Sequence, residues 1–251
     1  MASFFNEILY RPLFNALVYL YETAAFFDLG IAIILLTLII RFALYPLSKK
    51  AIKSQKAMFK IQPEIRELQE KYKDNKEELM KRTMALYKER GVNPFSGCLP
   101  ILIQLPILIA LYWVFLAGFD SENLDSLYSF VSNPGDINYV FLGSIDISQR
   151  NFYIALIAGF FQYIQSKMLL DQQLKGRRER EMKLKKENKK ETPNKMDDLS
   201  LSISKQMTYF MPIVTIFFAA SFQAGIAIYW ATTTIFSVVQ QWYVFKKTED
   251  K

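Results

Sequence analysis

The sequence predicts an all-α polytopic membrane protein with five transmembrane helices, a cytoplasmic helical hairpin and an N-terminal amphipathic interfacial helix. Of its 251 residues, 51% are hydrophobic, and these residues form long blocks that are separated by strongly charged blocks. Apolar blocks of about 18 or more residues are typical of membrane spans, because a helix rises about 1.5 Å per residue and the hydrocarbon layer is about 30 Å thick. We therefore expect one membrane domain over residues 1–251 rather than two soluble domains.

The first 28 residues are expected to form an amphipathic helix at the extracytoplasmic membrane surface. They are apolar and aromatic but are interrupted by charged residues and Pro12, while Leu13, Leu17 and Leu20 recur at near-helical spacing. A signal peptide is the alternative, but the segment lacks a basic start and a clear small-residue cleavage site. We therefore expect residues 1–28 to be retained.

Five apolar segments follow as predicted spans. The second has Gln104 as its only strongly polar residue, whereas Gln162, Gln165 and Ser166 weaken the hydropathy of the third. The predicted spans are residues 29–47, 98–119, 151–168, 207–222 and 225–245.

The charged connection 48–93 is predicted to be a cytoplasmic hairpin of two helices. Apolar residues recur at helical spacing from Ile61 to Tyr72, and the Asp74-Asn75 pair interrupts the pattern. The other connections are expected to be irregular in part. They are an acidic extracytoplasmic loop at 120–150, a charged cytoplasmic loop at 169–206 and a cytoplasmic tail at 246–251.

The distribution of basic residues predicts the topology. Residues 47–93 carry thirteen Lys/Arg against seven Asp/Glu, and residues 167–206 carry twelve against seven. Residues 118–150 carry one against five, and residues 1–28 carry one against three. Because basic connections stay in the cytoplasm, the N-terminus is expected outside and the C-terminus inside. Five spans satisfy this alternation, and four would not.

Arg41 lies within the first predicted span and has two interpretations. An arginine at mid-membrane costs about 2.5–3.5 kcal/mol on insertion scales. Its side chain could extend to the cytoplasmic headgroups, since Leu47 is only about 9 Å further along the helix. Alternatively it faces a wet cavity, with Thr37 and Tyr45 one turn away on the same face. The predicted spans contain no Asp or Glu, so the second interpretation makes Arg41 a site for a visiting anion.

Polar side chains on other predicted spans favour the wet cavity. Gln104 lies on the second, Gln162 and Gln165 on the third, and Tyr229 and Thr233 share a stripe of the fifth. Each of them alone is more often a hydrogen bond between helices. Together they indicate a hydrophilic groove.

The composition excludes several chemistries. The chain has one cysteine and no histidine, so it can form no intrachain disulfide, no histidine metal site and no histidine-assisted nucleophile. We therefore expect neither an enzyme nor a cofactor. An anion-binding solute transporter or channel remains as an alternative function, although no internal repeat and no membrane carboxylate supports it. An intramembrane protease lacks the usual partners for its nucleophile.

Four stretches of the sequence resemble the YidC/Oxa/Alb family of membrane protein insertases, in its bacterial YidC-type core. The match covers about Ile31 to Trp242, in the family's order. The stretches are "LTLIIRFALYPLSKKAIKSQKAM", "IQPEIRELQEKYKDN", "MALYKERGVNPFSGCLPILIQLPILIALYWVF" and "FQAGIAIYWATTTIFSVVQQW".

The resemblance implies a groove that is open to the cytoplasm and to lipid but closed on the outer side. It implies that Arg41 attracts acidic residues of an incoming chain, that Thr37 is a polar groove residue, and that Tyr229 and Trp230 contact the substrate. The implied partners are nascent membrane proteins and the lipid bilayer of the bacterial plasma membrane, with the ribosome and the Sec translocon as further candidates and no small-molecule substrate. The sequence departs from the family at Gln223, where proline is common.

Overall fold

The computed structural model describes residues 2–93, 95, 99–117, 126–186 and 195–249. These residues are helical apart from loops and one short β-hairpin, so the predicted all-α class is confirmed. The chain forms two compact units. The first unit comprises residues 1–45, 101–162 and 212–239, and the second comprises residues 46–100, 163–211 and 240–251.

The helices differ in length and hydropathy. Within the described ranges no single helix is long and apolar enough to cross a membrane alone, while α3 with α4 passes that test as a bent pair and 102–116 is a shorter apolar helix. The helices and strands are α1 (Ala2–Phe5), the π-helix η1 (Asn6–Tyr10), α2 (Arg11–Thr23), α3 (Leu29–Ala43), α4 (Tyr45–Lys71), α5 (Lys76–Glu89), α6 (Leu99–Ala117), β1 (Val140–Phe141), β2 (Ile145–Asp146), α8 (Phe152–Lys186), α9 (Lys195–Ser221) and α10 (Ala224–Glu249).

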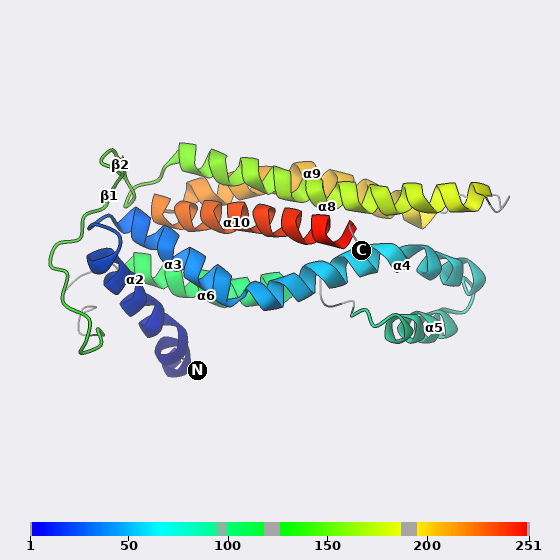
Figure 1. Ribbon diagram of the computed structural model, residues 1–251, viewed down its shortest axis with the longest axis horizontal. Helices are drawn as coiled ribbons and strands as arrows, with labels where there is room; N and C mark the ends of the chain where they lie inside the picture. Colours follow the sequence, from blue (N-terminus) through cyan, green and yellow to red (C-terminus); the bar gives the residue numbers. More distant parts are fainter. Residues whose placement is uncertain (1, 94, 96–98, 118–125, 187–194, 250–251) are drawn as a thin grey trace. The chain divides into compact units, whose positions relative to one another are not determined.

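In the first unit, α2 packs against α3 and buries one face (Figure 1). Pro12 lies at the start of α2, where a missing backbone N–H costs no helical hydrogen bond. Phe14, Leu17 and Val18 of its inner face are fully buried. One face of α2 therefore belongs to the core of the first unit, and the position of this helix at the membrane surface stays a prediction.

A tight turn connects α2 to α3. Phe26 and Phe27 have φ angles of 53° and 60°, an uncommon conformation for bulky residues. The turn is held because the Phe27 N–H donates to the Tyr21 carbonyl at 3.2 Å and because Asp28 caps α3, accepting from the Ile31 N–H at 3.0 Å. A side-chain cap at this position satisfies a backbone donor that the helix itself cannot.

Close helix packing in the first unit depends on two glycines. A Cβ atom at Gly159 would lie 2.2 Å from Ile216, so α8 and α9 can approach each other there only because the side chain is absent. A Cβ atom at Gly30 would lie 2.2 Å from the ring of Phe141. The β-hairpin thus rests directly on the first turn of α3.

The connection before α8 is hydrogen-bonded to the start of α10. The Ala224 N–H donates to the Gln149 carbonyl at 2.8 Å, and the Gly225 N–H donates to the Ile147 carbonyl at 3.2 Å. In the hairpin beside them, the Ser148 hydroxyl and backbone N–H donate to Asp146 at 2.6 and 2.9 Å, which lowers the pKa of that carboxyl. The described part of this connection is therefore an ordered structure.

In the second unit, α4 and α5 are joined by a short turn and lie side by side (Figure 1). Asn75 caps α5 by accepting a hydrogen bond from the Glu78 N–H at 3.0 Å. The Arg90 guanidinium donates from Nη2 and Nε to Glu64 at 2.8 and 3.1 Å, which ties the end of α5 to α4. Both side chains of this pair are partly exposed, so we attribute to it only a small stabilisation.

Helices extend into the connection 169–206. Helix α8 continues to Lys186 and α9 begins at Lys195, so most of the segment that was expected as a charged loop is helical. Lys, Arg, Glu, Leu and Met, which dominate here, are all good helix formers, although their charge removes the hydropathy signal. The cytoplasmic placement of the hairpin, the number of membrane spans and their topology stay predictions.

Candidate functional site

Three helices of the first unit bring polar side chains together around Arg41. Arg41 lies in the last turn of α3, is half-buried, and donates from Nη2 to Gln104 Oε1 at 2.7 Å. Gln104 lies on α6, and its Nε2 donates to the Tyr229 hydroxyl on α10. We call Arg41, Gln104 and Tyr229 the Arg41 cluster.

Packing fixes the position of the cluster. Tyr229 is only 3% exposed and belongs to the core of the first unit. Phe42, which follows the arginine, meets Phe236 of α10 edge to face with ring centroids 5.2 Å apart. Edge-to-face rings of this kind stabilise by about 0.5–1.5 kcal/mol beyond their burial. Helices α3 and α10 are therefore in contact close to Arg41.

The Arg41 cluster contains a permanent positive charge with a neutral partner. An arginine keeps its proton in proteins, so Arg41 is charged whatever surrounds it. Within the described residues it forms no ion pair, and its hydrogen-bond partner is the amide of Gln104. The Tyr229 hydroxyl accepts from the amide nitrogen, which turns the amide oxygen toward the guanidinium. The cluster is thus arranged to hold a cation without neutralising it.

Thr37 was also predicted for this site, but its hydroxyl is bonded within its own helix. It is 1% exposed and donates to the Ile33 carbonyl at 2.6 Å. Threonine in a helix interior commonly makes this bond, because the carbonyl four residues earlier is within reach. The structure therefore places Thr37 one turn from Arg41 without a direct hydrogen bond to the cluster.

The remaining predicted groove residues are half-buried. Thr233 lies one turn after Tyr229 on α10, and Trp230 packs against the rim of the core. Gln162 and Gln165 lie on α8, where Gln162 belongs to the first unit and Gln165 to the second. The roles of these four residues in a groove stay predictions.

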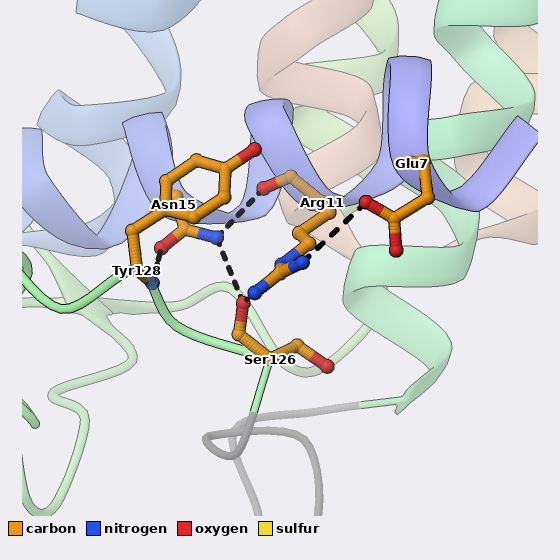
Figure 2. Close-up of polar contacts among 5 residues, drawn as sticks. All are labelled: Glu7, Arg11, Asn15, Ser126 and Tyr128. Atoms are coloured by element: carbon orange, nitrogen blue, oxygen red, sulfur yellow. Dashed lines mark hydrogen bonds and ion pairs between the residues drawn. The ribbon is translucent and has the colours of Figure 1, made fainter.

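A second polar cluster, which the sequence did not reveal, binds the connection before α8 to α2. Asn15 is 2% exposed, accepts from the Tyr128 N–H at 2.6 Å and donates to the Ser126 and Arg11 carbonyls at 3.1 and 2.8 Å (Figure 2). Arg11 Nε also donates to the Ser126 carbonyl at 3.1 Å, and its guanidinium lies 4.9 Å from the ring centroid of Tyr128. Glu7 pairs with Arg11 at 3.4 Å. We call these five residues the Asn15 clamp.

Two further bonds hold the same connection. The Asn138 N–H donates to the Tyr21 hydroxyl at 2.9 Å, and the Leu142 N–H donates to Asp28 at 2.8 Å. Asp28 therefore caps α3 with one oxygen and holds the β-hairpin with the other. The sequence signal for the clamp was the spacing of four residues between Arg11 and Asn15. This spacing places both polar side chains on one helical face among apolar residues.

Comparison with known proteins gives the class of this chain, which is a family of inner membrane proteins. The sequence model of the 60Kd inner membrane protein family matches residues 19–251, and the chain belongs to this family, the YidC/Oxa/Alb family that the motifs indicated. The chain is similar to the membrane protein insertase YidC of Francisella tularensis subsp. novicida (strain U112) and of Francisella philomiragia subsp. philomiragia. Each is 31% identical over 244 residues, which are 97% of this chain and 36% of the relative's length.

Proposed function

We propose that this chain is the core of a membrane protein insertase, which brings integral membrane proteins into the bilayer and assists their folding through a hydrophilic groove around Arg41. The observation that carries the proposal is a charged arginine in an apolar helix whose hydrogen-bond partner, among the described residues, is a neutral amide. Its relatives are named as membrane protein insertases, which agrees with this function.

The proposed reaction is an exchange of partners and forms no covalent bond. A carboxylate adds the attraction of its own charge and can accept from two guanidinium N–H groups at once, so a substrate carboxylate can replace the Gln104 amide on Arg41. Tyr229 keeps the displaced amide within the site, and the amide returns when the substrate leaves. Gln162, Gln165, Trp230 and Thr233 supply the remaining polar and aromatic surface of the groove in this proposal.

The groove lowers the cost of crossing for polar segments. Each unsatisfied backbone group in hydrocarbon costs several kcal/mol, so a wet path that reaches part of the way across shortens the dry path. The membrane potential, positive outside, then favours outward movement of an acidic tail by about 2.3 kcal/mol per charge per 100 mV. The apolar span of the substrate passes into lipid.

The topology in this proposal follows the distribution of charges. Five spans place the N-terminus outside and the basic segments 47–93 and 167–206 in the cytoplasm, as the positive-inside rule requires. The α4–α5 hairpin is then available to nascent chains, and the ribosome and the Sec translocon are proposed partners on the same side. No observation in the structure favours the alternative of an anion-binding transporter or channel.

The test compares wild type with Arg41→Lys, Arg41→Ala and Arg41→Glu in liposomes. Insertion of a single-span substrate with an acidic tail is measured beside insertion of its neutral-tail counterpart. We expect Arg41→Ala and Arg41→Glu to lower acidic-tail insertion by about tenfold or more, since a hydrogen bond to a charged group contributes about 1.5–3 kcal/mol. Arg41→Lys should retain most of it.

The neutral-tail substrate is the internal control of this experiment. Its insertion should change little across the series, because it places no carboxylate beside Arg41. If all four folded proteins insert both substrates equally, the proposed role of Arg41 is wrong, and the arginine only extends toward the headgroups. Flux of an anionic solute through the wild-type liposomes would instead support the transporter.

A further inference from the structure

Three bulky apolar residues of the first unit combine a strained backbone with an exposed side chain. Phe26 and Phe27, between α2 and α3, have φ angles of 53° and 60°, and Leu142, between β1 and β2, has a φ angle of 50°. They are 89%, 56% and 65% exposed. A positive φ is unfavourable for bulky residues, and glycine or asparagine adopts it more readily. We call Phe26, Phe27 and Leu142 the Phe26 patch.

A single carboxylate fixes both parts of the patch to the start of α3. Asp28 Oδ1 accepts from the Ile31 N–H at 3.0 Å and caps this helix, while Oδ2 accepts from the Leu142 N–H at 2.8 Å. Figure 1 shows the β-hairpin beside the start of α3. Two segments that are 114 residues apart in the sequence therefore present apolar side chains at one end of this helix.

The exposure of the patch does not come from a loosely packed turn. Ala25 and Leu29, on either side of the two phenylalanines, are 0% and 1% exposed. The ring of Phe27 meets the ring of Tyr21 edge to face, with centroids 5.6 Å apart. The turn is thus packed against the core on one side and directs apolar groups outward on the other. Apolar groups that are gathered at the surface in this way indicate a contact with a membrane or a partner.

The length of α3 favours the membrane. This helix has 15 residues, which span about 22 Å, whereas the hydrocarbon layer is about 30 Å thick. A span that is too short for the bilayer either thins it or needs further apolar groups at its end. The Phe26 patch lies directly before the first turn of α3 and supplies such groups.

The charges of the two segments favour the acyl chains over the lipid phosphates. The sequence has no lysine or arginine from residue 12 to residue 40 or from residue 126 to residue 149. The segments that form the patch therefore contribute no cation for a phosphate group or for an acidic partner protein. Phenylalanine and leucine are among the residues that enter the boundary between headgroups and acyl chains, to a depth of about 5–10 Å.

We propose that the Phe26 patch inserts into the leaflet that surrounds the N-terminal end of α3 and extends the apolar length of this short span. The proposal rests on the proposed function in one respect, because it takes α3 as a membrane span. It goes beyond that function by assigning a lipid contact to two loops that lie outside the proposed groove. The strained backbone keeps the side chains of these loops directed toward the acyl chains.

The depth of the patch is tested with nitroxide labels on the full chain, in phosphatidylcholine nanodiscs that each hold one copy. Cys98→Ser removes the single cysteine, so that one label can be placed at a time. Labels in Phe26→Cys and Leu142→Cys should collide more with oxygen, which dissolves in lipid, than with a polar nickel complex. Asp136 is exposed in the same connection as Leu142, and a label in Asp136→Cys should show the reverse. Greater access of nickel at positions 26 and 142 would overturn the proposal.

A label on α3 separates the failure of this proposal from the failure of the proposed function. Ile39 is 54% exposed and lies on the opposite face of the helix from Arg41. A label in lipid at Ile39→Cys, with labels in water at positions 26 and 142, would overturn the patch and leave the span intact. A label in water at position 39 as well would overturn α3 as a span and the proposed function with it.

The contribution to stability is tested with asparagine, which tolerates a positive φ. Phe26→Asn with Leu142→Asn therefore keeps the conformation of both loops and removes apolar surface. We expect Tm to fall by about 3–6 °C in nanodiscs of long-chain lipid, where α3 is shortest relative to the bilayer, and to change little in short-chain lipid.

The matched control removes two exposed apolar side chains elsewhere. Met80 and Met84 of α5 are 68% and 55% exposed, and Met80→Gln with Met84→Gln should give the same Tm change in both lipids. A loss in the Phe26 and Leu142 variant that is equal in both lipids would overturn the proposal. A higher Tm in both lipids would also overturn it, because the substitutions would then have relieved strain without removing a lipid contact.

Discussion

Two arginines of the first unit are held in different ways. Arg11 donates to the backbone carbonyl of Ser126, pairs with Glu7 and lies over the ring of Tyr128. Arg41 has, within the described residues, the side-chain amide of Gln104 as its hydrogen-bond partner. Arg11 is paired with a carboxylate and bound to a backbone carbonyl. Arg41 is instead held by a neutral side-chain amide, which can rotate away.

This difference separates a structural cation from one that is available to a ligand. A backbone carbonyl cannot leave its place without moving the chain, so a visiting carboxylate gains little at Arg11. A glutamine side chain can be displaced at the cost of its one hydrogen bond to the charged guanidinium, about 1.5–3 kcal/mol net. The comparison predicts that changes around Arg41 alter insertion selectively, and that changes in the Asn15 clamp alter stability.

The largest effect is expected from Gln104→Glu, which gives Arg41 a permanent partner of the kind that Arg11 already has. A carboxylate at this position would form an ion pair with Arg41, and breaking a buried pair costs about 3–5 kcal/mol. Acidic-tail insertion should therefore fall about a hundredfold or more, while neutral-tail insertion changes much less. The measurement is the ratio of the two insertion rates in liposomes.

Two controls sharpen this prediction. Gln206→Glu adds the same charge at an exposed position of α9 outside the proposed groove and should lower the ratio far less. Gln104→Glu on the Arg41→Ala background should lower acidic-tail insertion little beyond Arg41→Ala alone, since residues that act as a unit give non-additive effects. Additive losses in the double variant would mean that Gln104 acts independently of the arginine.

An intermediate effect is expected from Asn15→Ala in the clamp. The substitution leaves the part-buried Tyr128 N–H without its acceptor, which costs about 1–3 kcal/mol. For a chain of this size that corresponds to a Tm lower by about 2–4 °C per kcal/mol, measured by thermal unfolding in detergent. Asn6 is exposed, so Asn6→Ala is the matched control and should leave Tm unchanged. A lower insertion ratio with an unchanged Tm would contradict the structural role of Asn15.

The sequence predicted the Arg41 cluster better than the Asn15 clamp, because the polar residues of the two sites lie in segments of different composition. Arg41, Gln104 and Tyr229 interrupt segments that are otherwise apolar, so their grouping could be inferred from helical faces. Asn15 lies in a segment that already contains charged residues. Its partners are backbone groups, and the Tyr128 N–H is 113 residues away in the sequence. A hydrogen bond to a backbone group cannot be inferred from the pattern of side chains in a sequence, because every residue has a similar backbone.

Helix boundaries show the same limit. Hydropathy located the apolar parts of α8 and α9 but not their charged extensions, because helix propensity and hydropathy are separate properties of Lys, Arg and Glu. Thr37 was expected to share the polar site with Arg41; its hydroxyl donates to the Ile33 carbonyl of its own helix, and its role in a groove stays a prediction. The sequence gives the face on which a hydroxyl lies but does not decide between two acceptors on that face.

The smallest effect is expected from Glu7→Gln, which removes the ion pair of Arg11 and keeps its other contacts. The Glu7 side chain is 64% exposed and the pair distance is 3.4 Å, so solvent and salt screen most of the attraction. We expect the free energy of unfolding to change by less than about 0.5 kcal/mol, and the change should vanish at high salt. Chemical unfolding at low and high ionic strength measures both quantities. A loss as large as that of Asn15→Ala would mean that the ion pair, rather than the buried amide, holds the connection before α8 on α2, and the contrast between the two arginines would then rest on charge alone.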